Sequence, residues 1–290
     1  MKQKLTIALS VLVLLCAITG CIEYERQTMS YRHDPATDTL FIFQDYQGIF
    51  GRDDSTKLSE AEIDQLSSVI TGERTFFFSN WITEYNRERL EEAQRTPKGE
   101  LHNNPAYEEA IRQMAGVALA NVKVDNVGLY LNSEKQLCGS QRVTVNKVST
   151  VLAALNHLML FVAREEAEKE GTSTADKTRL LRFADSGQKM FTLEGNRLEV
   201  RWPVSEADYR SFRNDNAQAI AFREAGGTLS HADGMILITL GTKDAKSVSI
   251  TLPFAEKPYT GNALAEAKKH GIKDSFNAAA AAKAFLQPIP

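Results

Sequence analysis

Strand-like segments that come in neighbouring pairs constrain the fold of this chain more than any other feature. Within the pairs, polar and apolar residues alternate or β-branched and aromatic residues are enriched, and a short turn joins the two members. Gly195-Asn196, in the third pair, is a strong hairpin signal. Because such short turns join antiparallel strands, we expect hairpins. The three pairs are residues 22–33 with 39–46, 122–131 with 137–145, and 189–193 with 197–202.

Segments with helical periodicity separate these pairs. The longest spans residues 147–170, and its apolar residues Val148, Val151, Leu155 and Val162 share one face, so it is predicted to be a main core element. The sequence therefore predicts an α+β fold, with an antiparallel sheet built from hairpins and helices packed on it around one long central helix. We also expect a loop at 48–56, helices at 59–69, 80–95, 105–120, 176–184, 205–225 and 262–286 (interrupted near 271), and strands at 228–231, 235–241 and 247–252.

The amino terminus has the composition of an export signal. Lys2 and Lys4 precede an apolar run of about 14 residues, and small residues follow it. A helix needs roughly 20 apolar residues to cross a bilayer, so this run is short for a permanent span. The segment is predicted to be a secretory signal peptide.

The end of this segment, Ala17-Ile18-Thr19-Gly20-Cys21, resembles the lipobox of bacterial lipoprotein precursors. The resemblance covers residues 1–21 and implies that residues 1–20 are removed and that Cys21 carries fatty acids. It also implies a cell-envelope location with the membrane as a partner through the lipid anchor. Ile22 after the cysteine, in place of aspartate, favours the outer membrane. An uncleaved anchor helix and a signal peptide cleaved without lipidation are the alternatives.

Residues 21–290 are expected to form one domain, with a possible subdivision near 171–175. The chain has 34 basic and 37 acidic residues and no basic stripe, which argues against a nucleic-acid partner. Cys138 is the one cysteine after Cys21, so an internal disulfide is not expected. A lone cysteine of this kind is usually a small buried apolar residue, and that is the role we expect for Cys138.

No motif rises to a catalytic, metal or cofactor assignment. The segment 171–178 departs from a phosphate-binding loop because Asp176 replaces a glycine, and an interhelix loop with a helix cap is expected instead. His231 and Asp233 could be two metal ligands, but Asp233-Gly234 is itself a turn signal. The other features weighed are expected to be turn, surface or core residues: His33-Asp34, Asp53-Asp54, His102, His157, Trp202, and the aromatic cluster of Phe76, Phe77, Phe78 and Trp81.

The leading hypothesis is a noncatalytic envelope lipoprotein that binds or supports another envelope component. One alternative is an anchored hydrolase whose residues meet only in the fold, for which His231, Asp233 and a further acid or histidine should converge in a cleft. Another is a lipid or small-ligand carrier, for which the long helix should line a deep apolar cavity. An exposed aromatic patch over a closed core would favour a partner protein.

Overall fold

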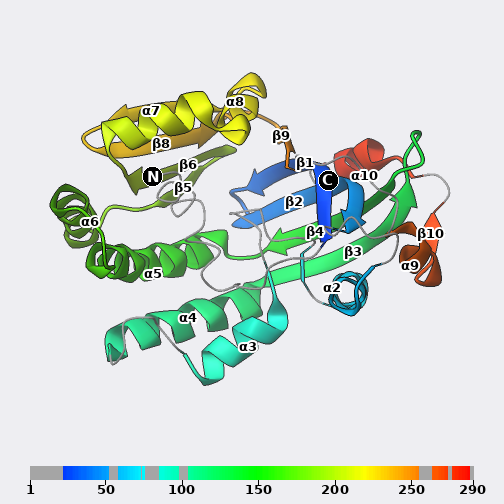
Figure 1. Cartoon of the computed structure of the whole chain (residues 1–290), viewed down its shortest axis with the longest axis horizontal. Coiled ribbons are helices and arrows are strands. Elements are labelled where there is room, and N and C mark those ends of the chain that lie inside the picture. Colours follow the sequence, from blue (N-terminus) through cyan, green and yellow to red (C-terminus); the bar gives the residue numbers. More distant parts are fainter. Residues whose placement is uncertain are drawn as a thin grey trace.

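The structure, a computed structural model, describes residues 22–51, 58–72, 74–75, 85–97, 104–254, 263–273 and 276–287. These residues form two sheets with helices packed around them (Figure 1). The larger sheet has six strands in the order β10-β3-β4-β2-β1-β9, and the smaller has four in the order β5-β6-β8-β7. Every neighbouring pair is antiparallel except β10 with β3. The predicted α+β class is confirmed.

All three predicted hairpins form. The strands of the larger sheet are β1 (Ile22–Asp34), β2 (Thr39–Gly51), β3 (Val122–Leu131), β4 (Leu137–Val145), β9 (Val248–Pro253) and β10 (Ile272–Lys273). Those of the smaller sheet are β5 (Phe191–Glu194), β6 (Arg197–Pro203), β7 (Thr228–Ala232) and β8 (Met235–Leu240). Gly195 has φ +56° and Glu194 pairs with Arg197, which is the two-residue loop that the sequence predicted.

One prediction about the strands needs correction. The loop expected from residue 48 is wrong for 48–51, because β2 continues through Gly51. Its last residues pair with the start of β1, and this pairing buries Ile49 and Phe50 completely. In addition, β9 follows β8 in the chain but joins the larger sheet, where it pairs with β1.

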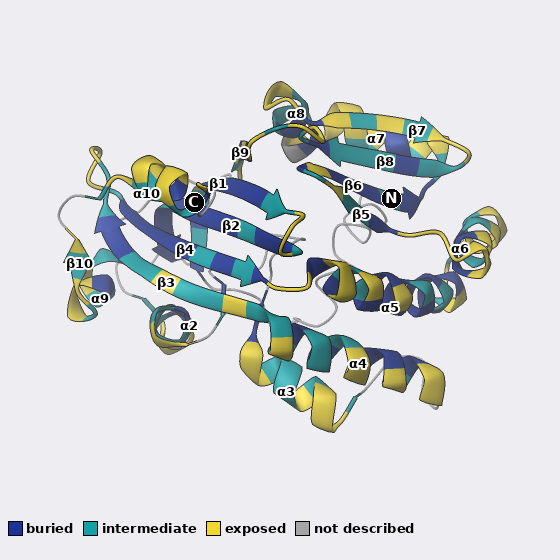
Figure 2. Ribbon diagram, turned by 180° about the vertical axis from the view of Figure 1, so that it is seen from behind, coloured by how far each residue is buried: buried dark blue, intermediate teal, exposed yellow. Residues whose placement is uncertain are grey.

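The described helices are α2 (Glu60–Thr71), α3 (Arg87–Arg95), α4 (Pro105–Asn121), α5 (Val148–Glu168), α6 (Thr174–Ser186), α7 (Glu206–Asp215), α8 (Ala217–Glu224), α9 (Leu264–Lys269) and α10 (Ala278–Phe285). The long central helix is confirmed as α5, with 21 residues. Figure 2 shows that the central strands are mostly buried, whereas α3 lies largely exposed. Of the described helices, α5 alone is long and apolar enough to cross a membrane, and its apolar face packs into the core.

Three helix predictions were too long. Asn86 is the N-cap of α3, so the expected helix 80–95 is not helical at 85–86. Asn216 ends α7 and caps α8, which divides the expected helix 205–225. Lys147 has left-handed φ +48° and precedes α5. The expected interruption of 262–286 near residue 271 is confirmed, because α9 ends at Lys269 and β10 follows before α10 begins.

A shared core joins the two sheets. One cluster of buried side chains includes Met29 and Ile42 from the larger sheet together with Leu198 and Leu240 from the smaller one. The tip of the β5–β6 hairpin also contacts β1 through Asn196. Its Oδ1 accepts from the backbone N–H of His33 (2.6 Å), and its Nδ2 donates to the carbonyl of Ala245 (2.7 Å). The hairpin tip is thus held between β1 and the loop before β9.

Candidate functional site

A cavity of about 1310 Å³ lies between α10 and one face of the larger sheet. We call this cavity the groove and the sheet face beneath it the outer face. By register, Thr28 and Ser30 of β1 and Phe43 and Asp45 of β2 belong to the outer face. α10 forms one wall and lies beside β1 and β2 in Figure 1. The start of β9 and the turn after β3 complete the rim.

Aromatic contacts hold α10 to the sheet at both ends. At the carboxyl end, the ring of Phe285 meets that of Phe41 edge to face (5.7 Å between centroids), and the Arg142 guanidinium lies 5.3 Å from the Phe285 centroid. Before the amino end, Phe276 packs against Tyr130 at 5.2 Å. Between these two anchors the helix presents only Ala278, Ala279 and Ala282, then Lys283, to the groove. Their small side chains leave the cavity open.

Asp45 is the central polar group of the groove floor, and its side chain has three neutral hydrogen-bond donors. Tyr130 Oη and Ser140 Oγ both donate to Asp45 Oδ1 at 2.7 Å, and Gln47 Nε2 donates to Oδ2 at 2.9 Å. Asp45 is only 5% exposed. The antiparallel register brings polar side chains beside Asp45, because Thr28 lies opposite it on β1 and Ser140 lies opposite it on β4. A buried carboxylate needs such donors to offset the cost of leaving water.

The groups beside Asp45 stay protonated. Burial, and then the negative charge of Asp45, raise the pKa of the Tyr130 hydroxyl well above its usual range, so it remains a donor. Burial likewise raises the pKa of the Cys138 thiol to about 11. Cys138 is 0% exposed and free. It is the small buried cysteine that the sequence predicted, and near neutral pH it is a poor nucleophile because the thiolate is the reactive form.

Hydroxyl and amide side chains surround Asp45. Thr28 Oγ1 and Thr251 Oγ1 lie 2.8 Å apart across β1 and β9, as do the hydroxyls of Ser30 and Ser249. Each of these hydroxyls both donates and accepts, and its proton rotates to suit the partner. Asn132, Gln47 and Asn277 add amide groups to the lining. The groove therefore offers many uncharged hydrogen-bonding groups around one carboxylate.

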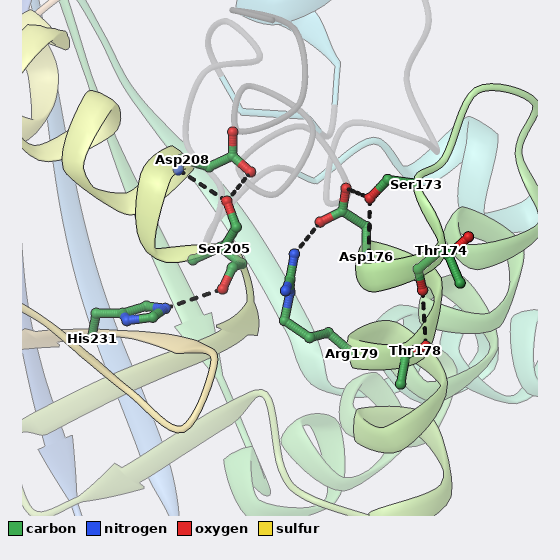
Figure 3. A network of polar contacts seen from close by, with 9 residues as sticks. Ser173, Thr174, Asp176, Thr178, Arg179, Ser205, Asp208 and His231 are labelled. Carbon is green, nitrogen blue, oxygen red and sulfur yellow. Dashed lines mark hydrogen bonds and ion pairs between the residues drawn. The ribbon is translucent and has the colours of Figure 1, made fainter.

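His231 takes part in a structural network away from the groove. Its Nδ1 lies 2.5 Å from Glu206 Oε2, and its Nε2 lies 3.1 Å from the carbonyl of Val204 (the latter drawn in Figure 3). Both ring nitrogens are therefore engaged by oxygen atoms of the protein. Tyr209 stacks on the ring at 5.2 Å. Such a histidine has no free nitrogen to act as a general base.

The metal and phosphate interpretations are not supported. Asp233 lies in the β7–β8 turn with φ +53°, as the turn interpretation predicted, and the described residues contain no cluster of three histidine, cysteine or acidic side chains. Ser173 caps α6 by accepting from the backbone N–H of Asp176 (3.2 Å), and Asp176 pairs with Arg179 (Figure 3). The expected interhelix loop with a helix cap is confirmed.

The other weighed residues have structural contacts or are not described. His33 Nδ1 lies 3.1 Å from the carbonyl of Gly195, and Asp34 accepts from the backbone N–H of Ala36 in the β1–β2 turn. His157 contacts Phe161, and Trp202 is buried in the core. The remaining predictions lie outside the described residues: Cys21, Asp53, Asp54, Phe76, Phe77, Phe78, Trp81 and His102.

Sequence reasoning missed the groove. One signal was present: Gln44, Asp45 and Gln47 interrupt an otherwise largely apolar and aromatic strand, and hydroxyl residues alternate along the segments that became β1 and β9. A polar residue in a strand of this kind marks a face with a partner other than the core. The partners of Asp45 come from distant parts of the chain, and no local pattern names them.

Comparisons with known proteins assign no family. No family model matches the chain, and neither the curated proteins nor the solved structures contain a match. Its function is therefore inferred from its sequence and its geometry alone.

Proposed function

We propose that this protein is a lipoprotein of the bacterial cell envelope, anchored through Cys21 with the outer membrane favoured, and that it binds an envelope component in the groove without chemical change. The groove carries the functional part of this proposal. It is a large cavity whose floor holds a carboxylate oriented by three donors. Orienting polar groups in a roomy cavity are typical of binding sites.

The chemistry of the lining supports binding rather than hydrolysis. The described lining residues include one carboxylate, Asp45, and no histidine. Glycoside hydrolysis commonly uses two carboxylates, and a serine or cysteine nucleophile needs an adjacent base. His231 and Asp233, which the hydrolase alternative required, lie on β7 and its turn and do not line the groove.

The apolar-carrier alternative receives less support. Residues of α5 do not line the groove. A second cavity, bordered by apolar side chains such as Met29, Leu40 and Leu198, has a volume of about 10 Å³. That is about the space of one water-sized probe and far too small for a lipid chain. A polar ligand fits the described cavities better.

The position of Ile22 supports a short tether between the proposed lipid anchor and the folded chain. Ile22, the residue after the proposed lipid attachment site, is the first residue of β1 and is 3% exposed. Its backbone N–H donates to Gln65 Oε1 (3.1 Å), which fixes β1 to α2. An antiparallel strand rises about 3.4 Å per residue, so Thr28 lies roughly 20 Å along β1 from Ile22. The groove would then lie close to the membrane surface.

Two measurements in intact cells test the proposal. Labelled palmitate should be incorporated into the wild-type chain and not into Cys21→Ala; equal labelling of the two, or none in wild type when another lipoprotein is labelled, refutes the anchor. A photo-reactive residue at position 279, which lines the groove, should crosslink an envelope component. The same residue at position 280, which is exposed on α10 but does not line the groove, is the matched control. The same crosslinks from both positions, or none from 279, refute the binding role of the groove.

A further inference from the structure

The groove also indicates the class of its ligand, an inference that rests on the proposed binding function. We propose that the groove binds a neutral saccharide chain. Four features of the groove support this assignment: the single carboxylate among its described lining residues, the character of its polar groups, the nature of its floor, and its size.

Asp45 favours a ligand that donates hydrogen bonds and carries no negative charge. Among the described residues its carboxylate accepts three bonds, two at Oδ1 and one at Oδ2. An ionised carboxylate has about four acceptor positions, so one remains at Oδ2 for a ligand hydroxyl. The three donors are neutral, and the charge of Asp45 therefore repels a phosphate or carboxylate placed beside it. The lysines of the groove, Lys246 and Lys283, are exposed residues rather than partners of Asp45.

The other polar groups match hydroxyl groups of a ligand. Thr28, Ser30 and Ser249 present hydroxyls that can donate or accept. The side-chain oxygens of Asn132 and Asn277 already accept from backbone N–H groups, so these two amides offer a ligand N–H donors. A saccharide hydroxyl likewise donates and accepts. Phe276, which is half-buried, adds apolar surface on which the C–H face of a sugar ring can pack. The lining thus combines adaptable hydrogen bonding with a flat apolar patch.

The floor disfavours an extended peptide. A peptide gains most from pairing its backbone with an open strand edge. The floor of the groove is a sheet face, where β1 is paired with both β2 and β9 and where β2 is paired with β4. Only side chains are offered there. A saccharide requires no backbone ladder and satisfies its hydroxyls with side chains.

The size of the groove suits several sugar rings. Pockets for drug-sized ligands usually measure about 300–1,000 Å³. The groove, at about 1310 Å³, exceeds that range and is partly open to solvent. A short oligosaccharide, or a segment of a longer chain that leaves through the open side, therefore fits better than a single small molecule.

Calorimetric titration of the full chain, in a zwitterionic detergent without a sugar headgroup, tests this inference. The neutral probes are tetra-N-acetylchitotetraose and maltotetraose, and the comparison probes are inorganic phosphate and palmitate. We expect at least one neutral probe to bind. Ala279→Trp should weaken that binding at least tenfold by filling the groove, whereas Ala280→Trp, on the same exposed helix but outside the lining, should change it less than twofold.

A second pair of variants keeps the test valid if the tryptophan disturbs α10. Thr28→Val removes a hydroxyl that lines the groove with little change of shape, and it should weaken saccharide binding about fivefold, as expected for one lost hydrogen bond. Thr251→Val removes the other hydroxyl of the same pair, which does not line the groove, and should have a smaller effect. Equal effects of the two variants would contradict a saccharide in the groove.

The outcomes separate the ligand class from the binding role. Binding of phosphate or palmitate, but not of either saccharide, that is lost in Ala279→Trp overturns the saccharide and leaves the groove as a binding site. Failure of both saccharides, together with crosslinks from position 279, also overturns the saccharide alone. Saccharide binding that Ala279→Trp and Thr28→Val leave unchanged overturns the assignment to the groove.

Discussion

Replacement of Asn196 by alanine should weaken both sheets together. The Asn196 side chain, at the tip of the β5–β6 hairpin, is 5% exposed and makes two bonds that reach other parts of the chain. It accepts from the backbone N–H of His33 in β1 and donates to the carbonyl of Ala245 before β9. Alanine keeps the backbone but removes both bonds. The tip of the smaller sheet would then contact the larger sheet only through its backbone and apolar neighbours.

The expected loss of stability follows from the two backbone groups that lose their hydrogen-bond partners. A buried donor or acceptor left without a partner costs about 1–3 kcal/mol. His33 and Ala245 are only half-buried, so water can reach them in part, and the lower half of that range applies. For the two groups together we therefore expect the free energy of unfolding to fall by about 2–4 kcal/mol. Asn121→Ala is the control, because its side chain donates only to a carbonyl within its own helix, that of Val117 (2.8 Å), and should cost no more than about 1 kcal/mol.

Urea unfolding of the full chain in detergent, followed by hydrogen exchange with peptide resolution, measures this effect. If the sheets unfold as one unit, Asn196→Ala should lower protection by the same free energy in β2 of the larger sheet and in β6 of the smaller one. Loss of protection confined to β6 would show that the sheets unfold separately. A decrease in the free energy of unfolding of less than about 1 kcal/mol would refute the contribution assigned to the two hydrogen bonds.

Cys138, Asp38 and the Glu194–Lys243 pair give three further expectations. Peptide mass analysis at pH 8 should show alkylation of Cys138 by iodoacetamide in urea and almost none in the folded chain, since the thiol is buried with a pKa of about 11; equal rates would contradict this. Asp38→Ala should lower the free energy of unfolding in urea by about 1 kcal/mol, because its carboxylate accepts from the backbone N–H and hydroxyl of Ser149 at the start of α5, and an unchanged urea midpoint would rule out this cap. The Lys243 ammonium lowers the pKa of Glu194, and the Glu194 carboxylate raises that of Lys243. The stability difference between wild type and Glu194→Gln should therefore be full between about pH 4.3 and 10.4, disappear as the pH falls below or rises above that window, and shrink in high salt; a difference that persists at pH 2 would contradict this origin.

The features that the sequence predicted are those with nearby causes. The helix expected from residue 59 forms as α2, whose start is fixed by a capping box in which Ser59 and Glu62, three positions apart, satisfy each other's backbone N–H groups. Gly195 adopts its left-handed conformation within a two-residue loop. The apolar face of α5 follows from its own repeat. Each signal and its structural consequence lie within a few residues of one another.

The features that the sequence missed depend on distant partners. The last residues of β2 are extended because β1 pairs with them, and the sequence at 48–51 does not predict this pairing. The first turn of α5 is capped by Asp38, 111 positions before Ser149, while Lys147 before it has a left-handed backbone. β10 is two residues long and exists through its parallel pairing with β3. Local propensity carries no information about any of these contacts.

Asp45 shows why the groove is among the features that depend on distant partners. It also supports the proposed role of the groove. On the outer face, its own strand places Phe41 and Phe43 under α10, so an apolar face is sufficient to hold that helix. An apolar residue at position 45, with apolar partners in place of Tyr130 and Ser140, would avoid the cost of a buried charge. The chain instead buries a carboxylate among neutral donors where the alanines of α10 leave a cavity. A polar group that breaks the apolar pattern of its strand, located where a ligand has room, is the basis of the proposed binding role.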